Sequence, residues 1–314
     1  MDWLSTVPAY PLVLLAVMIA SRLIPLSEAY HPLTFFRFFA QQLANKVNPD
    51  LQRSRQQQLL SGSLAIVVAL LPCLILVYAL YQFSELPLIL DALVLYCSLD
   101  WHTQSKVAVD TSLLIQKKQL SLARQQASKI LLRDTDKLNA MGLSKALIES
   151  VLLQSSKLFI GTLGYFLLGG GLAALGYRLL QELQRQWNPK LNQFHWFGHP
   201  ASLLATLFAF PALLLSSIII AFQYGIVHCI KNCQKARIFF NRGSFYLLSC
   251  SSVALQRDLG GPAFYNQKKI FRQRFVAKDQ PSAADIVTAV RLANFLHLYL
   301  LLLVFAINLF MYIR

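Results

Sequence analysis

Long apolar stretches without charged side chains alternate with polar, basic loops along this chain of 314 residues. A helix needs roughly 20 apolar residues to cross the core of a bilayer. Five stretches meet this requirement, and they predict membrane spans near residues 3–21, 59–84, 158–177, 201–227 and 292–313. The pattern therefore predicts an all-α, polytopic helical integral membrane protein, with residues 1–314 forming a single membrane domain.

A sixth apolar stretch, residues 86–101, is shorter and contains Asp91. If it crosses, 25 of the 29 Lys and Arg residues fall on one side of the membrane; if it does not, 20 do. Because positive charge accumulates in cytoplasmic loops, we predict six spans with both termini outside. The cytoplasmic loops are then residues 22–58, 102–157 and 228–291. A re-entrant hairpin around Asp91 is the alternative, which leaves five spans.

The composition agrees with a membrane protein and excludes other classes. Apolar residues make up 56% of the chain and charged residues 14%, against about 25% charged in soluble proteins. The apolar fraction excludes a disordered chain, and five Cys in 314 residues exclude a secreted disulfide scaffold. The net charge of +15 fits basic loops beside a bilayer, so we expect no nucleic-acid partner.

The loop of residues 102–157 has a helical pattern. Apolar residues recur every three or four positions from Leu120 to Leu131, which predicts an amphipathic helix. Asp134 and Thr135 end it, since their side chains compete for backbone hydrogen bonds. A second helix is expected from about Gly142 through Glu149 into the next span. No part of the chain alternates clearly enough to predict a sheet.

Three other patterns have a structural and a functional interpretation. The glycines between Gly161 and Gly176 favour close helix packing, and no P-loop sequence accompanies them. His195 and His199 have the spacing of metal ligands, but their aromatic neighbours favour an interfacial belt. His228, Cys229 and Cys233 could face a metal; buried thiols near the end of a span are favoured.

The sequence Gly260-Gly261-Pro262 predicts a sharp turn. Two glycines permit positive φ, and successive amides in such a turn can bind an anion. Four basic residues follow closely: Lys268, Lys269, Arg272 and Arg274. The turn therefore indicates a phosphate-binding site, with contact between the basic residues and anionic lipid as an equal alternative.

Glu149 is an acid at the start of a membrane helix, after Ala146, Leu147 and Ile148. An unpaired carboxylate is costly to bury in a membrane. If Glu149 faces the helix bundle, it is therefore a candidate functional residue.

These pieces, in this order, resemble the CobD/CbiB membrane family of cobalamin biosynthesis, the adenosylcobinamide-phosphate synthases. The similarity runs from about residue 28 to residue 295. The matching residues are His31-Pro32, Arg133-Asp134-Thr135 with Leu138, Ile148-Glu149-Ser150-Val151, Leu167 to Gly170 with Tyr177-Arg178, Phe197-Gly198, Leu259-Gly260-Gly261-Pro262 with Tyr265, and Asp285-Ile286 with Ala289 and Leu292.

The resemblance implies an ATP-dependent amide (C–N) ligase in the bacterial cytoplasmic (inner) membrane. It would join aminopropanol or its phosphate to the corrinoid adenosylcobyric acid, with ATP and Mg²⁺ as cofactors. The implied partners are these substrates, the lipid bilayer and other membrane proteins of cobamide assembly. The expected catalytic residues are Glu149 and Asp134. Substrate and phosphate would contact His31, Arg133, Thr135, Gly260, Gly261, Pro262, Tyr265, Lys268 and Lys269, and Asp285 would also belong to the site.

The chain departs from the family pattern where the family has acids. Residues 152–159 read LLQSSKLF, residues 181–184 read QELQ, and residues 203–207 are mostly apolar. Either the acids that remain suffice, or catalysis is altered or lost. The alternative function is therefore a non-catalytic membrane protein that binds a partner, similar to the AmpE-like regulators of the same superfamily.

Overall fold

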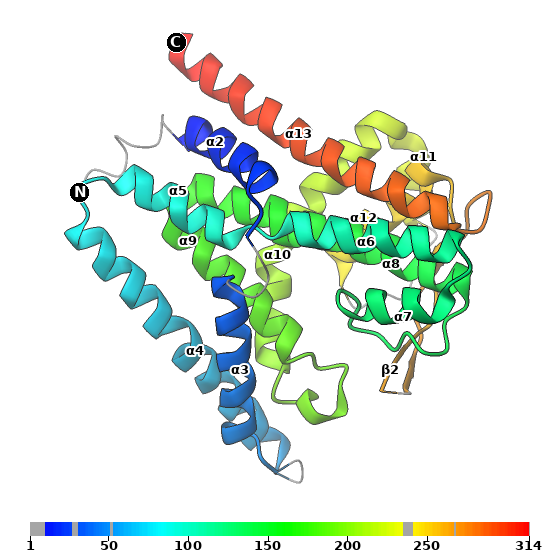
Figure 1. Ribbon diagram of the computed structural model, residues 1–314, viewed down its shortest axis with the longest axis horizontal. Coiled ribbons are helices and arrows are strands. Elements are labelled where there is room, and N and C mark those ends of the chain that lie inside the picture. The colour runs from blue at the N-terminus through cyan, green and yellow to red at the C-terminus, as the bar shows by residue number, and fades with distance from the viewer. Residues whose placement is uncertain (1–9, 27–30, 51–52, 235–240, 267, 314) are drawn as a thin grey trace. The chain divides into compact units, whose positions relative to one another are not determined.

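The computed structural model divides into two compact units, and nearly all of its elements are helices (Figure 1). Unit 1 comprises residues 1–100, 161–208 and 301–314, and unit 2 comprises residues 101–160 and 209–300. The structure describes residues 10–26, 31–50, 53–234, 241–266 and 268–313.

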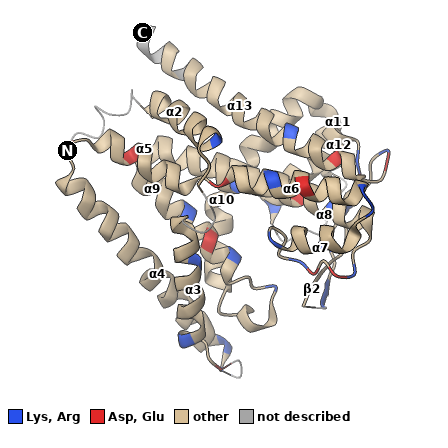
Figure 2. Cartoon of the chain, in the orientation of Figure 1, with Lys and Arg blue, Asp and Glu red and all other residues tan. Residues whose placement is uncertain are grey.

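Four helices in the described residues are long and apolar enough to cross a membrane. They correspond to α4 (Arg55–Phe83), the helical run from Ala140 to Gln186, α10 (His199–Tyr224) and most of α13 (Ala283–Ile313). The second of these runs consists of several segments, which are described below. With 29 residues, α4 measures about 44 Å. Its only charged residue is Arg55 at the first position, so its length is almost free of charge in Figure 2.

The two remaining predicted spans are shorter helices. Residues 3–9 of the first predicted span lie outside the described residues, and α2 (Tyr10–Leu23) follows them with 14 residues. The stretch of residues 86–101 forms α5 (Pro87–Ser98), whose 12 residues measure about 18 Å. This is less than the ~30 Å hydrocarbon core, so the length of α5 favours the re-entrant alternative for that stretch.

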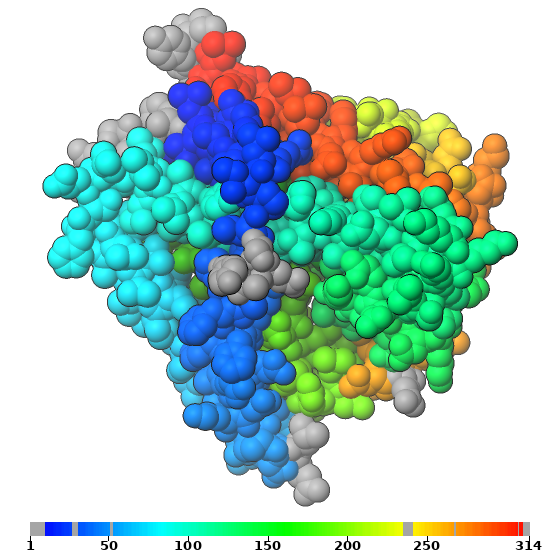
Figure 3. All heavy atoms as spheres, viewed as in Figure 1, coloured from blue at the N-terminus to red at the C-terminus, as the bar shows by residue number. Residues whose placement is uncertain are grey.

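Unit 1 packs α3 (Pro32–Val47), α4 and α9 (Gly161–Gln186) around one apolar core. His31 caps α3, because its Nδ1 accepts the Leu33 amide at 3.2 Å. The side chains of α3 and α4 lie against each other, as the blue and light-blue spheres of Figure 3 show. Trp187 is fully buried in this core and donates its indole N–H to the Ala40 carbonyl at 3.0 Å.

The glycine-rich segment of α9 contains a break as well as packing contacts. Gly161 lies against the ring of Tyr177, where a Cβ would not fit. At Gly169 and Gly170 the backbone leaves the helical conformation, and Gly170 has φ +67°. The buried Asp91 carboxylate of α5 accepts the Gly171 amide at 2.6 Å and the Tyr81 hydroxyl at 2.5 Å. Asp91 thus caps the second half of α9, where an anion is favoured at the amino end of a helix.

Unit 2 surrounds α8 (Ala140–Gln154), most of whose side chains are buried. It packs against α6 (Trp101–Gln116), α7 (Leu120–Ser128), α12 (Arg242–Leu255) and β1. The predicted helix near Leu120–Leu131 and the second helix into the next span are confirmed. Between α8 and α9 lies a π-helical segment, η3 (Ser155–Ile160). The other short helices are η4 (Asn192–Phe194) in unit 1 and α11 (Ile226–Gln234) in unit 2.

The basic loop of unit 2 adds strand pairings that the sequence pattern did not predict. β1 (Leu259–Gly260) pairs antiparallel with β4 (Arg274–Phe275), and β2 (Ala263–Tyr265) pairs with β3 (Lys268–Ile270). The strands have two or three residues each, too few to show a period-2 pattern in the sequence. The pairings fold the loop back on itself and hold the Gly260–Pro262 turn beside α8.

Candidate functional site

The buried carboxylate of Glu149 is the centre of the candidate site in unit 2. It lies on α8, whose start is fixed because Asn139 accepts the Gly142 amide at 2.8 Å. The Glu149 side chain is only 3% exposed. Its Oε1 accepts the Gly260 amide at 2.8 Å. The second oxygen faces two arginines, so both carboxylate oxygens are engaged.

Arg133 and Arg272 bring positive charge to Glu149 from opposite directions in the sequence. Arg272 Nη2 lies 3.0 Å and Arg133 Nη2 lies 3.4 Å from Glu149 Oε2. Burial works to lower the pKa of Arg272, but the Glu149 charge outweighs it and raises that pKa. For Arg133, burial prevails over the same carboxylate and lowers the pKa. The ordinary pKa of a guanidinium group lies far above neutral pH, so we treat both guanidinium groups as charged. The carboxylate acts as their common counter-ion.

The predicted turn has the expected backbone conformation, with φ +73° at Gly260 and +87° at Gly261. Its amides are already engaged, however. The Gly260 amide donates to Glu149, and the Gly261 amide donates to the Gln273 carbonyl at 2.8 Å. The expected anion of this turn is therefore the carboxylate of Glu149 itself. Arg272 closes the turn by donating its Nε–H to the Gly261 carbonyl at 3.1 Å.

Lys145 belongs to this site although the sequence analysis did not select it. It precedes Glu149 by four residues on α8, which places both side chains on one face of the helix. Its Nζ lies 3.7 Å from the position that a Cβ on Gly261 would occupy. The spacing to Glu149 was a signal available in the sequence. We call Arg133, Lys145, Glu149, Gly260, Gly261 and Arg272 the Glu149 cluster.

The Glu149 cluster has three cations and one acid, so it carries an excess of two positive charges. A neighbouring pair does not change this excess: Arg274 Nη2 lies 2.5 Å from Asp258 Oδ2. Asp258 also accepts the Ala277 amide at 2.7 Å. Burial works to raise the pKa of Asp258, but the amide and Arg274 outweigh it and lower that pKa. The cluster therefore suits a negatively charged ligand group, such as a carboxylate or a phosphate.

The strand pairing connects the predicted residues Asp134 and Tyr265 to the Glu149 cluster. The Asp134 amide donates to the Phe264 carbonyl at 3.0 Å, and Asp134 Oδ1 accepts the Asn266 amide at 3.2 Å. Tyr265 is buried and acts electrostatically on Arg133. Asp134 thus joins the loop that carries Arg133 to the segment of β2 and Asn266.

The remaining predicted residues lie outside the Glu149 cluster. Thr135 is buried beside Arg133, and Pro262 is exposed just after the turn. Lys268 and Lys269 are exposed on β3, and Lys269 lies 5.0 Å from the ring of Phe271. His31 belongs to unit 1, where it caps α3.

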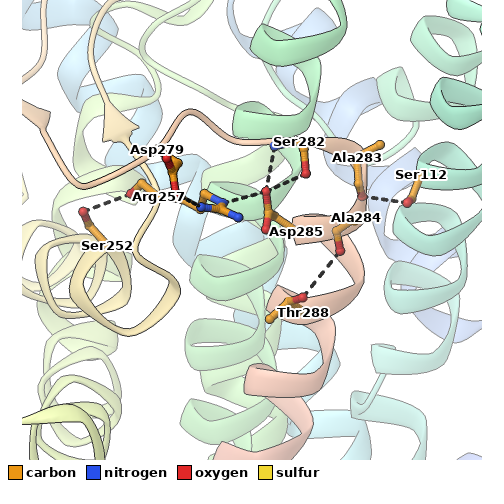
Figure 4. A network of polar contacts seen from close by, with 9 residues as sticks. All are labelled: Ser112, Ser252, Arg257, Asp279, Ser282, Ala283, Ala284, Asp285 and Thr288. Carbon is orange, nitrogen blue, oxygen red and sulfur yellow. Dashed lines mark hydrogen bonds and ion pairs between the residues drawn. The ribbon is translucent and has the colours of Figure 1, made fainter.

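Asp285 has a structural role at the start of α13, which Figure 4 shows. It accepts hydrogen bonds from the Ser282 amide at 2.8 Å and the Ser282 hydroxyl at 2.7 Å. It also forms an ion pair with Arg257 at 2.8 Å. Arg257 in turn contacts the more exposed Asp279 at 2.8 Å. Asp285 therefore completes a helix cap and fixes the chain that precedes β1.

The described residues contain no group of three or more His, Cys, Asp or Glu side chains placed to hold a metal ion. Cys229 is buried and Cys233 is half-buried, while His228 is exposed. Glu149 already has three donors. The acids therefore do not fit a magnesium site built by the protein alone, and we derive no reaction step through a metal.

Several proteins resemble this chain along most of its length. A cobalamin biosynthesis protein CobD from Chromobacterium violaceum is 26% identical over 284 residues, which cover 88% of this chain and 90% of the relative. A protein of the same name from Stutzerimonas stutzeri is 25% identical over 83% of this chain and 86% of its own. No solved structure matches the chain. These relatives do not favour the AmpE-like alternative. The model of the CobD/Cbib protein family matches residues 13–293, and the chain belongs to this family.

Proposed function

We propose that this membrane protein acts in cobalamin biosynthesis by forming the amide bond of adenosylcobinamide phosphate. It would join the amino group of aminopropanol phosphate to a carboxylate of adenosylcobyric acid; with aminopropanol itself the same step would give adenosylcobinamide without the phosphate. Conversion of a carboxylate and an amine into an amide removes the elements of water, and hydrolysis of ATP to ADP and phosphate would drive this step. Family membership and the names of the relatives support the pathway.

One observation carries the assignment of the site: a buried carboxylate holds two arginines and a glycine turn together beside a lysine. The participants lie far apart in the sequence, since Glu149 is 111 residues from Gly260 and 123 from Arg272. Burying a charged network is costly, and each member depends on the others for compensation. The presence of this buried charged network supports a role in binding or catalysis, because the fold of a surface loop does not require such a network.

The chemistry of these residues suits charged substrates. Arginine donors bind carboxylates and phosphates with strong, directional hydrogen bonds. We assign Arg133, Lys145 and Arg272 to the anionic group of a substrate, and Glu149 to positioning the two arginines. Mg²⁺ is commonly held by one or two carboxylates together with substrate phosphates, so a nucleotide would have to bring most of its ligands.

Growth of a synthase-deficient bacterial strain on cobyric acid tests the proposal. We expect the wild-type chain to restore growth and Glu149→Gln to fail, while both accumulate in the membrane. The matched control is Asp279→Asn, which also removes an acid paired with an arginine in unit 2, but at a side chain that is 57% exposed. Failure of the wild-type chain would reject the ligase; equal growth with Glu149→Gln would reject the site.

A further inference from the structure

Unit 1 contains a second buried group of charges, which the Glu149 cluster does not include. Arg37 of α3 donates its Nε–H to Glu182 Oε2 at 2.8 Å, and its Nη2 lies 3.4 Å from Asp100. From α9, Arg178 Nη2 lies 2.8 Å from Glu182 Oε1, and Arg185 acts electrostatically on both Arg178 and Glu182. We call these five residues the Arg178 cluster.

The charges of the Arg178 cluster do not balance, because three guanidinium groups face two carboxylates. The neighbouring His31 adds no charge near neutral pH, since burial lowers its pKa from 6.5. The side chains of Arg178 and Glu182 are 0% exposed, so the excess positive charge lies inside the protein. A buried charge without compensation is strongly destabilising, which indicates that a counter-ion belongs here.

Several donors of the cluster also have no acceptor in the described part of the chain. Arg178 Nε and Nη1 and Arg185 Nη1 are buried, and none makes a hydrogen bond. Arg178 Nη2 lies close to Glu182 Oε1 as an ion pair, but the contact does not have the geometry of a hydrogen bond. Buried polar groups are nearly always hydrogen-bonded. Excess charge and unused donors are independent observations, and both point to a missing anion with several acceptor oxygens.

We propose that the Arg178 cluster binds a phosphate group through Arg178 and Arg185. A phosphate carries between one and two negative charges at neutral pH and three acceptor oxygens, which suits one excess positive charge and the unused donors of Arg178 and Arg185. The side chains of Arg37 and Asp100 are 20% and 12% exposed, so the cluster is open on their side. The proposal does not rest on the proposed ligase, because the cluster and its test lie in the other unit.

The phosphate could belong to a soluble ion or ester, or to a lipid headgroup. Hydrogen–deuterium exchange of the full chain distinguishes them. In detergent, inorganic phosphate is compared with chloride at equal ionic strength. In nanodiscs, phosphatidylglycerol is compared with a neutral bilayer-forming lipid that lacks phosphate, such as a digalactosyl diacylglycerol. We expect slower exchange in peptides covering α3 and residues 178–190. Peptides covering residues 257–275 report separately on the Glu149 cluster.

Two variants test whether the protection depends on the proposed donors. Arg185→Gln removes a half-buried arginine and Arg178→Gln a fully buried one, while Arg53→Gln is the matched control at an exposed arginine of the same unit. We expect both cluster variants to weaken phosphate binding by about tenfold or more, since one charge-assisted hydrogen bond contributes that much. If Arg178→Gln does not fold, Arg185→Gln decides alone.

Glu182→Gln gives a change of opposite sign. It frees Arg178 from its competing carboxylate, so phosphate should bind more tightly than in the wild type, although the unliganded protein becomes less stable. Slower exchange that is lost in Arg185→Gln, in either detergent or nanodiscs, supports the proposal. The experiment in which it occurs identifies the source of the phosphate. No protection in either arm, equal protection in the variants, or weaker binding by Glu182→Gln would overturn it.

Discussion

Glu149 and Gly260 form a hydrogen bond of 2.8 Å across 111 residues of sequence. The bond joins a membrane-helix residue to a turn whose two glycines both have positive φ. The carboxylate fills the position that an external anion would take at this turn. Glu149 therefore holds the turn in place. A ligand anion would bind to the neighbouring cations and not to the amides of the turn.

Replacing Glu149 by Gln should remove the only negative charge of the Glu149 cluster while keeping the size of the side chain. Arg133 and Arg272 would lose their counter-ion in a buried place, which typically costs about 3–5 kcal/mol. We expect a lower free energy of unfolding, measured by thermal denaturation in detergent, together with loss of growth on cobyric acid. Asp279→Asn should change neither by a comparable amount, because its ion pair is more exposed. A fully stable Glu149→Gln protein would contradict the packing described.

The two glycines of the turn should differ in their response to alanine. A Cβ on Gly260 would lie 2.1 Å from the Gln273 carbonyl oxygen, so the backbone must move. At Gly261 the nearest atom is Lys145 Nζ at 3.7 Å, and the cost is mainly the positive φ, about 1–2 kcal/mol. We expect Gly260→Ala to be the more destabilising change in thermal denaturation. The reverse order would show that the turn has another conformation.

Lys145→Met should separate ligand binding from stability. The change removes a charge and retains most of the apolar side chain, and none of the ion pairs among the described residues involves Lys145. We expect KM for a phosphate-bearing or carboxylate substrate to rise roughly tenfold, equivalent to about 1.4 kcal/mol, with an unchanged melting temperature. Lys137→Met, at an exposed lysine of the same loop, is the control. An unchanged KM would remove Lys145 from the site.

The sequence predicted those parts of the site that depend on local chemistry. The positive φ values at Gly260 and Gly261 follow from residue type. The helix that was expected to end at Asp134 already ends at Ser128, and Asp134 Oδ1 accepts the distant Asn266 amide. The sequence could not predict in the same way which basic residues would contact Glu149. Arg272 reaches Glu149 because β1 pairs with β4, whereas Lys268 and Lys269 point elsewhere although their charges are the same.

The membrane helices show the same difference between local and long-range information. Apolar length predicted α4, α10 and α13. The break at Gly170 depends on Asp91, which lies 80 residues from the amide of Gly171 that it accepts. A glycine run alone is compatible with packing and with a kink, and only the position of the acid decides between them.

His31 should make the stability of unit 1 depend on pH. Burial lowers its pKa below the ordinary 6.5, although Asp100 acts in the opposite direction. Above about pH 6.5 neither state binds the proton, and stability is complete. As the pH falls, the unfolded chain is protonated first, so stability decreases by up to about 1.4 kcal/mol per pH unit, until the pH passes the folded pKa.

Thermal denaturation between pH 7 and about pH 5 measures this slope. His31→Asn keeps a side-chain oxygen that can cap α3, so the helix should form while part of the pH dependence disappears. His195→Asn, at an exposed histidine, should leave the slope unchanged. Identical slopes for wild type and His31→Asn would show that the imidazole is not buried in its neutral form.

The last prediction concerns the side of the membrane on which the basic loops lie. If α2 and α5 both contribute crossings, the loops of residues 22–58, 102–157 and 228–291 share the cytoplasmic side with 25 of the 29 basic residues. If only the four long helices cross, residues 22–58 lie opposite the other two loops, and 20 basic residues share one side. The positive-inside rule favours the first arrangement, whereas the 12-residue length of α5 favours the second. We predict the first, with α5 and the neighbouring chain completing the crossing.

Cysteine labelling tests this arrangement, with single cysteines introduced at Ser54 and Lys137 in a chain without its native cysteines. Both cysteines should resist a membrane-impermeant thiol reagent in intact cells and react after permeabilisation. Labelling of Ser54→Cys alone in intact cells would establish that α5 does not cross the membrane, and would overturn the six-span arrangement.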